Sequence, residues 1–216
     1  MLYISETTVS MDLSNHSSFV LATNNPAKVT EIKHLFNEAG LSLISPADLG
    51  LHVSPNETGK TFAENSYQKA SETRRLLKKA GHDSYCVVAD DSGFEVDALG
   101  GLPGVDSALF LGEDATYEER NAHILNEMKL MEDRKARFVC VLTCIFPGGE
   151  HEVIRAEVEG EVARIAKGKN GFGYDPIFYV PEFGKTMAEL TLDEKNKISH
   201  RGIAINRLIQ KAASKR

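Results

Sequence analysis

The stretch Phe138–Phe146 is apolar on both of its alternating faces, and this limits the possible folds of the chain more than any other feature. Successive side chains of a strand point to opposite faces of a sheet. A strand that is apolar on both faces needs cover from both sides, as in the centre of a layered α/β protein. Gly148 and Gly149 then mark a turn into a partner strand near Val153–Val158, which predicts a hairpin.

Strand and helix signals alternate through the N-terminal half. Phe19–Thr23 is a short apolar run that leads into a helix, with Asn25 as the N-cap and Pro26 at the first helical position. Further helices are expected to begin at the capping-box patterns Thr61–Glu64 and Thr116–Glu119. Additional strands are expected at Leu41–Ser45, Tyr85–Ala89 and Pro176–Val180, and a final helix at Ser199–Ala213. This alternation predicts an α/β protein with a mixed sheet.

The bulk composition excludes several classes of protein. The formal charge of the 216-residue chain is −6, and no basic tract exceeds two residues, so we expect no nucleic-acid partner. Three cysteines are an odd number and do not suggest a disulfide framework; Cys140 and Cys144 are expected in the core. No apolar run approaches the roughly 20 residues of a membrane span. Residues 1–18 lack the pattern of a signal peptide and are interpreted as a flexible extension before a single domain at 19–216, in the cytoplasm.

The segment Thr23-Asn24-Asn25-Pro26-Ala27-Lys28 is a candidate anion site. Backbone N–H groups at a helix N-terminus suit a phosphate, and Lys28 adds a formal positive charge. The segment is not a Walker A loop. The alternative is a well-capped helix that carries a solvated lysine.

Two acidic segments are candidates for metal or acid–base chemistry. Asp90 and Asp91 end a buried strand, where carboxylates can hold Mg²⁺ or act as a general base, although only one of the two side chains should face a cleft. The alternative for this pair is an Asx turn. Glu57 has no capping duty and is a second metal-ligand candidate, whereas Glu64 is expected to be a capping-box partner and Lys69 a solvated lysine.

Two segments near the C-terminus suit the binding of a nucleobase, one through its ring face and one through the polar groups at its edge. Gly168–Pro176 places glycines around Phe172 and Tyr174, which allows close backbone approach and stacking of a base. The alternative is that the two aromatic side chains fill the hydrophobic core. Ser199 can cap the last helix, which leaves His200 and Arg201 at its N-terminus. Cations there oppose the helix dipole, so they suggest an anionic or carbonyl-bearing ligand, the alternative being a charged surface turn.

Together these segments resemble the family of inosine triphosphate pyrophosphatases. The resemblance covers about Phe19 to Leu208 and rests on the runs ADDSGFEVDALGGLPGV, NGFGYDPIF, GKTMAEL and EKNKISHRG. It implies an elongated mixed β-sheet flanked by helices, with two lobes around a central nucleotide-binding cleft, and usually a homodimer. It also implies Mg²⁺-dependent hydrolysis of ITP, dITP or XTP to a monophosphate and pyrophosphate.

The resemblance assigns roles to the candidate residues. Asp91 would be the proton acceptor, and Glu57 and Asp91 would serve the Mg²⁺ site. The substrate-binding residues would be Thr23, Asn24, Asn25, Pro26, Ala27, Lys28, Ser92, Phe172, Gly173, Tyr174, Asp175, Lys195, His200 and Arg201. Asn24 and Ala27 stand where the family commonly has glycine, and Asp106 and Leu109 replace a frequent tyrosine and arginine, which weakens expectations for the loop around them.

Two alternatives stay open at this stage. A Maf-like pyrophosphatase acting on pyrimidine or modified nucleotides would share the architecture, although the SHRG and FGYDP segments argue against it. A non-catalytic nucleotide sensor would bind without cleaving. Retention of Asp91, Glu57 and Lys195 together argues against such a sensor.

Overall fold

The computed structural model describes residues 18–53 and 58–213 and has an eight-stranded mixed sheet. The strand order is β2-β1-β3-β5-β6-β7-β8, with β4 paired to β3. The first strands, β1 and β2, run parallel, as do β1 and β3, and the remaining neighbours are antiparallel. The strands are β1 Ser18–Leu21, β2 Ser42–Ile44, β3 Cys86–Val96, β4 Pro103–Gly104, β5 Lys135–Ile145, β6 His151–Val162, β7 Phe178–Val180 and β8 Lys185–Thr186. The expected mixed α/β fold is confirmed.

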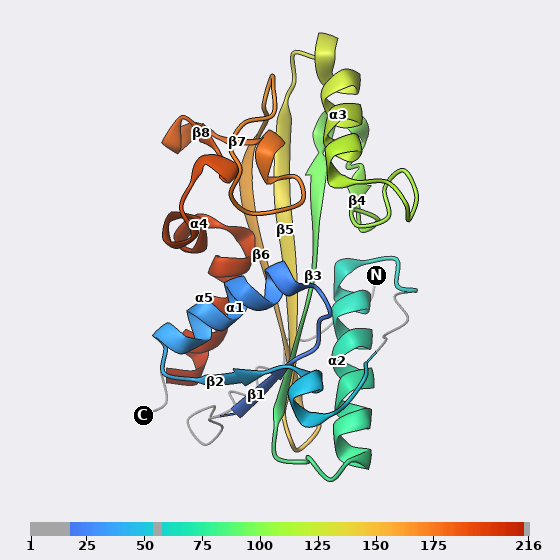
Figure 1. Ribbon diagram of the computed structural model, residues 1–216, viewed down its shortest axis with the longest axis vertical. Helices are drawn as coiled ribbons and strands as arrows, with labels where there is room; N and C mark the ends of the chain where they lie inside the picture. Colours follow the sequence, from blue (N-terminus) through green and yellow to red (C-terminus); the bar gives the residue numbers. More distant parts are fainter. Residues whose placement is uncertain (1–17, 54–57, 214–216) are drawn as a thin grey trace, which may run out of the picture.

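Helices flank this sheet along its length (Figure 1). The α-helices are α1 Pro26–Glu38, α2 Phe62–Lys79, α3 Tyr117–Glu127, α4 Leu192–Ile198 and α5 His200–Ala213. Single 3₁₀ turns are η2 Pro46–Leu49, η3 Asp97–Leu99, η4 Met128–Leu130, η5 Asp175–Ile177, η6 Pro181–Phe183 and η7 Met187–Glu189. In the view of Figure 1, α1, α2 and α5 lie in the lower half and α3, β7 and β8 in the upper half. No helix among the described residues combines the length and apolar character that crossing a membrane requires.

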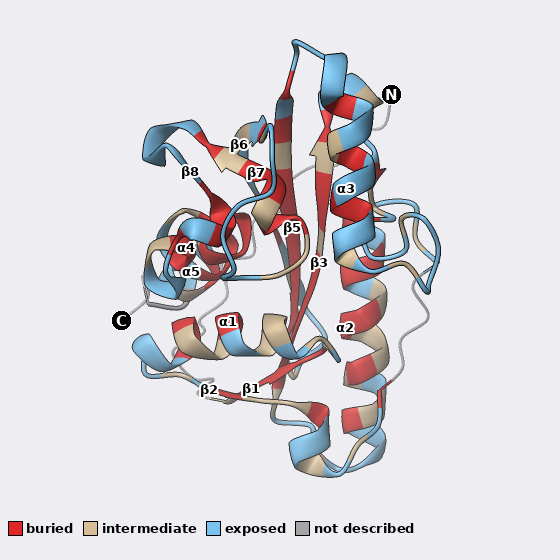
Figure 2. Cartoon of the chain, turned by 45° about the horizontal axis from the view of Figure 1, so that its top comes forward, coloured by how far each residue is buried: buried red, intermediate tan, exposed pale blue. Residues whose placement is uncertain are grey.

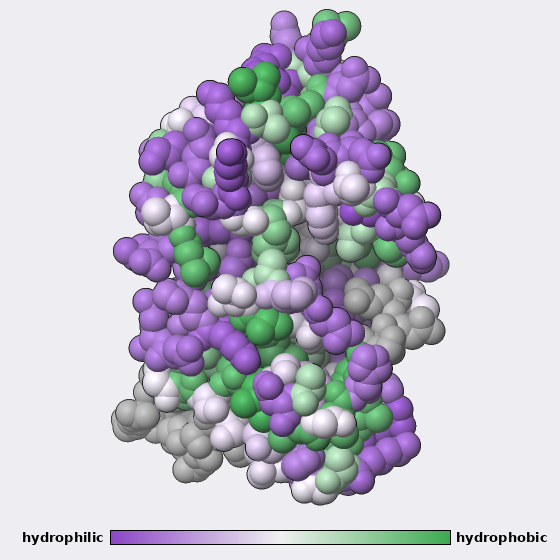
Figure 3. Space-filling model, in the orientation of Figure 1, coloured by the Kyte–Doolittle hydropathy of each residue, from purple (hydrophilic) through white to green (hydrophobic). Residues whose placement is uncertain are grey.

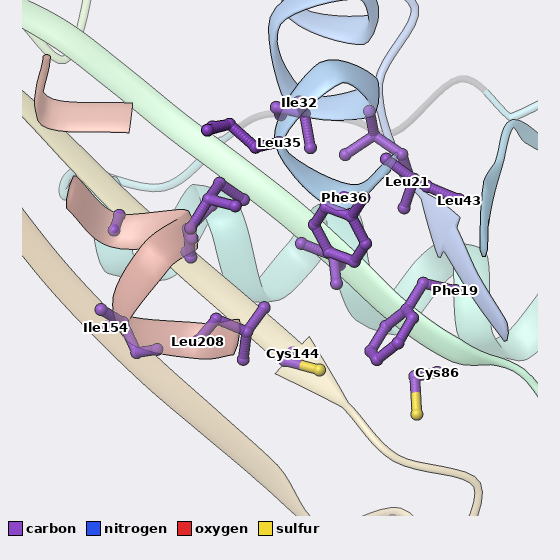
Figure 4. Close-up of a cluster of buried hydrophobic side chains, with 14 of the residues drawn as sticks. Phe19, Leu21, Ile32, Leu35, Phe36, Leu43, Cys86, Cys144, Ile154 and Leu208 are labelled. Atoms are coloured by element: carbon purple, nitrogen blue, oxygen red, sulfur yellow. The ribbon is translucent and has the colours of Figure 1, made fainter. Parts of the chain in front are cut away.

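The central hairpin is confirmed, because β5 pairs with β3 on one side and with β6 on the other. Residues of β3 and β5 are buried along most of their length (Figure 2). Cys140 and Cys144 lie on one face of β5 in the core, as expected. That face packs against α1 and α5, and Figure 4 shows side chains of these helices meeting β1 and β5. The α1/α5 core includes Phe19, Leu21, Ile32, Leu35, Phe36, Leu43, Cys86, Cys144, Ile154 and Leu208.

The alternation of β3 decides where its acidic residues point. Cys86 and Val88 face the α1/α5 core, whereas Val87 and Ala89 pack with Ala70 and Leu77 of α2. By the two-residue period of a strand, Asp90 continues the first face and Asp91 the second. The two carboxylates therefore lie on opposite faces of one strand.

The expectation that this strand stops at Asp90 is wrong. The strand continues to Val96, because β5 pairs with it without a break from Val87↔Ile145 to Val96↔Ala136. Continuous pairing satisfies the backbone groups that a turn would otherwise have to satisfy. Gly93 fits this packed strand because a Cβ there would clash with the Phe62 ring and the Gly104 carbonyl oxygen.

The local helix signals are confirmed, with two corrections near the C-terminus. Asn25 caps α1, and Thr61 and Thr116 form capping boxes with Glu64 and Glu119. The strand expected at Pro176–Val180 is only β7, because Asp175–Ile177 forms the turn η5. The helix α4 was not expected, although Thr191 and Glu194 form a capping box at its start.

Candidate active site

A cavity of about 310 Å³ is lined by residues of α1, α2 and α5 and by residues of α3 and the Phe172–Asp175 segment. Its volume is within the range of small-molecule sites, roughly 300–1,000 Å³. A hollow is visible at mid-height in the space-filling view (Figure 3). Its lining is Ala22, Thr23, Asn24, Asn25, Lys28, Lys69, Asp91, Ser92, Gly93, Phe94, Val105, Ser107, Ala108, Tyr117, Phe138, Phe172, Gly173, Tyr174, Asp175, Lys195, His200 and Arg201. Most of the residues expected at a site are therefore brought together.

The first part of the wall is the β1–α1 turn. The side chain of Asn25 accepts hydrogen bonds from the backbone N–H groups of Ala27, at 3.0 Å, and Lys28, at 3.3 Å. Asn24 donates through Nδ2 to the carbonyl oxygen of Val53, at 2.9 Å, which fixes the turn against the next loop. Lys28 turns its ammonium group to Asp90, at 3.1 Å. The turn is thus held from both sides and presents Lys28 to the cavity.

Pro26 and Ala27 are not among the residues that line the cavity, and their contact with a substrate stays a prediction. Side chains in the first turn of a helix are spaced about 100° apart around its axis, so only some can face one side. Lys28 takes that direction in α1, and Pro26 is exposed. Any contribution of Pro26 and Ala27 to ligand binding must come through the backbone.

Asp91 lies on the α2 side of the cavity and is 6% exposed. Its Oδ1 accepts a hydrogen bond from Lys69 Nζ at 2.6 Å, and its Oδ2 accepts one from Asn65 Nδ2 at 3.3 Å. Burial raises the pKa of the Asp91 carboxyl above its usual value, although Lys69 opposes the shift. A carboxyl group with a raised pKa at a cavity wall suits proton transfer.

Lys69 corrects another expectation, since it is buried rather than solvated. Lys69 is in the second turn of α2, on the face that packs against β3, and its position beside Asp91 gives a buried ion pair. Long-range pairing of this kind leaves no local signal in the sequence. The helical spacing of Lys69 with the buried residues Phe62, Ser66 and Thr73 could have placed it on the inner face.

Asp90 is fully buried on the opposite face of β3 and does not line the cavity. Its Oδ2 accepts a hydrogen bond from the Ser92 hydroxyl at 2.7 Å and pairs with Lys28 and with Arg201 Nε, at 3.1 and 3.4 Å. Burial alone would raise the pKa of the Asp90 carboxyl, but the cations Lys28 and Arg201 outweigh it and hold that pKa well below its usual range. Only Asp91 of the two faces the cavity, as the sequence predicts.

The loop Phe172–Asp175 forms the upper wall. Asp175 Oδ2 accepts hydrogen bonds from the backbone N–H of Phe172, at 2.7 Å, and from Lys195 Nζ, at 2.6 Å. The two contacts close the loop, with Gly173 at φ +67°, a conformation that favours glycine. The half-buried ring of Phe172 has Lys195 Nζ 4.9 Å and the Arg201 guanidinium 5.4 Å from its centroid. Phe172 is therefore the aromatic surface of this wall.

Tyr174 lines the cavity and also packs in the hydrophobic core, as in the alternative interpretation of this segment. Its ring stacks on Phe94 with centroids 5.1 Å apart, and its hydroxyl donates to the carbonyl oxygen of Ser107 at 2.7 Å. Asn121 of α3 donates to the carbonyl oxygen of Gly173 at 3.0 Å. These contacts join α3 to the loop.

The cation Arg201 at the start of α5 is paired with a carboxylate inside the chain, so its unfavourable interaction with the helix dipole is offset without a ligand. Arg201 Nη1 donates to Glu31 Oε2 at 2.6 Å, and Glu31 Oε1 accepts from Lys195 at 2.6 Å. Glu31 lies on α1 and was not a candidate from the sequence. Its i, i+4 spacing with the inward-facing Leu35 could have placed it on the buried face. Ser199 caps α5 as expected, by accepting from the backbone N–H of Gly202.

His200 is buried, and its ring stacks on Phe138 with centroids 4.8 Å apart. Burial lowers the pKa of His200 well below its usual value, and the neighbouring charges of Arg201 and Lys195 act in the same direction. The imidazole is therefore neutral at neutral pH. It can orient a ligand by hydrogen bonding but adds no charge.

The metal-ligand prediction for Glu57 falls on a residue outside the described part of the chain. Within residues 18–53 and 58–213, no group of three or more His, Cys, Asp or Glu side chains is arranged to hold a metal ion. Asp91 is the described carboxylate with access to the cavity beside Lys28 and Lys69.

Comparisons with known proteins agree on one family. Residues 19–211 match the model of the Ham1 family. A protein named dITP/XTP pyrophosphatase from Clostridium perfringens is 45% identical over 192 residues, covering 88% of this chain and 94% of that protein. One with the same name from Bacillus subtilis is 44% identical over 191 residues, covering 88% of this chain and 93% of that protein. The Ham1 protein structure from Staphylococcus aureus is similar with a TM-score of 0.79 at 40% identity, covering 92% of this chain and all of that one.

Proposed function

The chain belongs to the Ham1 family, and from this we propose that it hydrolyses non-canonical purine nucleoside triphosphates such as dITP, XTP and ITP to a monophosphate and pyrophosphate. The family expected from the motifs is confirmed. The observation that carries the proposal is that Asp91, Lys195 and Phe172, distant in sequence, open onto one cavity. Relatives named for dITP and XTP favour a purine substrate over the Maf-like alternative.

The proposed substrate fits the cavity by charge. Four cations line it: Lys28 and Lys69 could share the negative charge of a polyphosphate, and Lys195 and Arg201 lie towards the nucleoside end. The turn Thr23–Asn25 and Lys28 would face the phosphates, and Ser92 would contact the substrate beside Asp91. Phe172, Asp175, Lys195, His200 and Arg201 would surround the nucleoside. Every base can stack on Phe172, so the selectivity between bases must come from hydrogen-bonding groups.

We propose Mg²⁺ as the cofactor, held by Asp91 and by Glu57. The donor chemistry fits, because Mg²⁺ prefers carboxylate oxygens and usually takes only one or two from the protein, with substrate phosphates completing its coordination. Asp91 presents such a carboxylate at the cavity wall. When bound, the ion would neutralise charge on the phosphate oxygens.

In the proposed reaction, Asp91 accepts a proton from the attacking water, and the anhydride bond between the α- and β-phosphates breaks. The oxygen of the water stays on the phosphorus that it attacks, and the bond electrons leave with the bridging oxygen on the other product. Lys28 and Lys69 hold the charged phosphates in place, and catalysis of this kind is mostly positioning and electrostatic stabilisation. Lys69 can contact a phosphate and Asp91 at the same time, because its Nζ already donates a hydrogen bond to Asp91 Oδ1 at 2.6 Å.

Selectivity for a 6-oxo purine follows from the donors at the nucleoside end. Lys195 and Arg201 are cationic donors that can approach O6 of hypoxanthine or xanthine. Adenine has an amino group at that position, so donor would face donor, and an unpaired buried donor costs about 1–3 kcal/mol. ATP should therefore be a poor substrate.

The decisive experiment is product analysis with ITP, XTP, GTP and ATP, with and without Mg²⁺. We expect free pyrophosphate from ITP and XTP only when Mg²⁺ is present, and little from ATP. GTP also carries O6, so little product from GTP would show that the pocket disfavours the 2-amino group. Orthophosphate as the direct product would overturn the reaction type. Binding of ITP without any product would instead favour a sensor.

We also propose a cytoplasmic homodimer. The three cysteines are free and buried, as is usual for proteins of a reducing compartment. Leu102, Leu109 and Leu111 are exposed apolar side chains on either side of β4, and a second copy could cover them. Light scattering should give twice the mass of one chain, and cell fractionation tests the compartment.

A further inference from the structure

A single carboxylate oxygen lies behind the cavity wall and contacts three residues that line it. Oδ2 of Asp90 is 2.7 Å from the Ser92 hydroxyl, 3.1 Å from Lys28 Nζ and 3.4 Å from Arg201 Nε. These partners come from β3, α1 and α5, and all three line the cavity. Asp90 itself is 0% exposed and does not line it.

The two cations serve different ends of the proposed substrate. Lys28 projects from the first turn of α1, where the phosphates would lie, and Arg201 stands over the Phe172 ring, where the base would lie. Both are held by the same oxygen of Asp90. The second partner of Arg201 is Glu31, which also accepts a hydrogen bond from Lys195.

We infer that Asp90 is a positioning residue that sets Lys28 for the phosphates and Arg201 for the base, and that it is neither a metal ligand nor a proton acceptor. This inference rests on the proposed function, since it assigns Asp90 a part in the same reaction. Asp90 touches no substrate and acts only through its partners.

The position of Asp90 argues against a role as a metal ligand or as a general base. A metal ligand or general base must reach the cavity, and Asp90 faces the α1/α5 side of β3 with no exposed surface. Asp91, on the opposite face, has the access that both direct roles require.

Asp90→Asn tests the inference, because it keeps the shape of the side chain and removes its charge. Removing a negative charge behind the wall leaves the cavity more positive, so inorganic tripolyphosphate should bind at least as tightly as in the wild type. Mispositioned cations should nevertheless lower kcat for ITP by about 10²-fold. The ratio of kcat/KM for ITP to that for ATP should fall on the order of tenfold, because Arg201 is no longer fixed.

Glu152→Gln is the matched control, since it also neutralises a strand carboxylate paired with a cation of α5, Lys211, away from the cavity. Its kcat and selectivity should equal those of the wild type. A folded Asp90→Asn protein with normal kcat and normal selectivity would overturn the inference. So would a loss of activity that only matches the unfolded fraction, or a loss that excess Mg²⁺ restores, as expected for a metal ligand.

If Asp90→Asn does not fold, the double variant Asp90→Asn with Lys28→Met removes both members of the pair and is compared with Lys28→Met alone. The two should bind tripolyphosphate equally, and the double variant should have the lower selectivity for ITP over ATP. Equal selectivity would overturn the inference. A wild-type protein that releases no pyrophosphate from ITP would instead reject the proposed function, while tripolyphosphate binding would still report on Asp90.

Discussion

Glu31 and Lys195 are 164 positions apart in the chain, yet Lys195 Nζ donates to Glu31 Oε1 at 2.6 Å in the buried wall between α1 and α4. The same carboxylate receives Arg201 at 2.6 Å. Burial alone would raise the pKa of Glu31, but Arg201 and Lys195 outweigh it and lower that pKa. One carboxylate on α1 therefore fixes the two cations that α4 and α5 bring to the cavity.

Glu31→Ala should be strongly destabilising. It leaves two buried cations without this counter-charge, and breaking a buried ion pair by removing one partner costs about 3–5 kcal/mol. Urea unfolding at neutral pH measures the change in the free energy of unfolding. Glu38→Ala, on the same helix but exposed, is the control and should change it by less than about 0.5 kcal/mol. A Glu31→Ala protein as stable as this control would show that the buried pairs contribute nothing to the fold.

Asp91→Asn should lower turnover of ITP by about 10²–10⁴-fold, the usual effect of losing a positioned base. The change keeps the shape of the side chain and its place beside Asn65 and Lys69. Thermal unfolding checks that the fold is intact, and pyrophosphate release measures turnover. Near-normal turnover in a folded variant would remove Asp91 from its proposed role.

Features that depend on neighbouring residues could be predicted from the sequence. The caps at Asn25, Thr61 and Thr116 all form, because a cap needs only the next three residues. The central strand β5 was predicted for a similar reason, since apolar character on both faces is visible within nine residues. The capping box Thr191–Glu194 was equally visible, but the surrounding charges hid a helix of only seven residues.

Features that depend on distant partners could not be predicted. The continuation of β3 through Asp90 and Asp91 is imposed by pairing with β5, against the turn preference of these residues. From the sequence, Lys69 is expected to be solvated and nothing singles out Glu31, whereas the fold places Asp91 beside Lys69 and Arg201 beside Glu31. The candidate site residues were found through motifs, whereas the buried network that holds them required the structure.

Phe172→Ala should weaken binding of the nucleoside but not of the phosphates. Base–aromatic stacking is worth about 1–3 kcal/mol, so KM for ITP should rise roughly 5- to 150-fold. Affinity for inorganic tripolyphosphate, measured by calorimetry, should not change, because Phe172 lies on the upper wall. Phe183→Ala, an exposed phenylalanine in η6, is the control for loss of an aromatic ring. An unchanged KM in the Phe172 variant would place the base elsewhere.

His200 should make the protein less stable as the pH falls. Burial, followed by the charges of Arg201, Lys195 and Lys28, lowers its folded-state pKa well below 6.5, while Asp90 acts in the opposite direction. Below about pH 6.5 this histidine is protonated in the unfolded chain but stays neutral in the folded chain. Its contribution to the free energy of unfolding is therefore fully present above this pH and is lost below it. From about pH 7 to about pH 5.5 this loss is about 1 kcal/mol.

His200→Gln should remove that part of the pH dependence, measured by urea unfolding at both pH values. His123→Gln, an exposed histidine of α3, should keep it. A His200→Gln protein with the wild-type slope would mean that His200 is protonated in the folded state, so that it would add positive charge to the cavity.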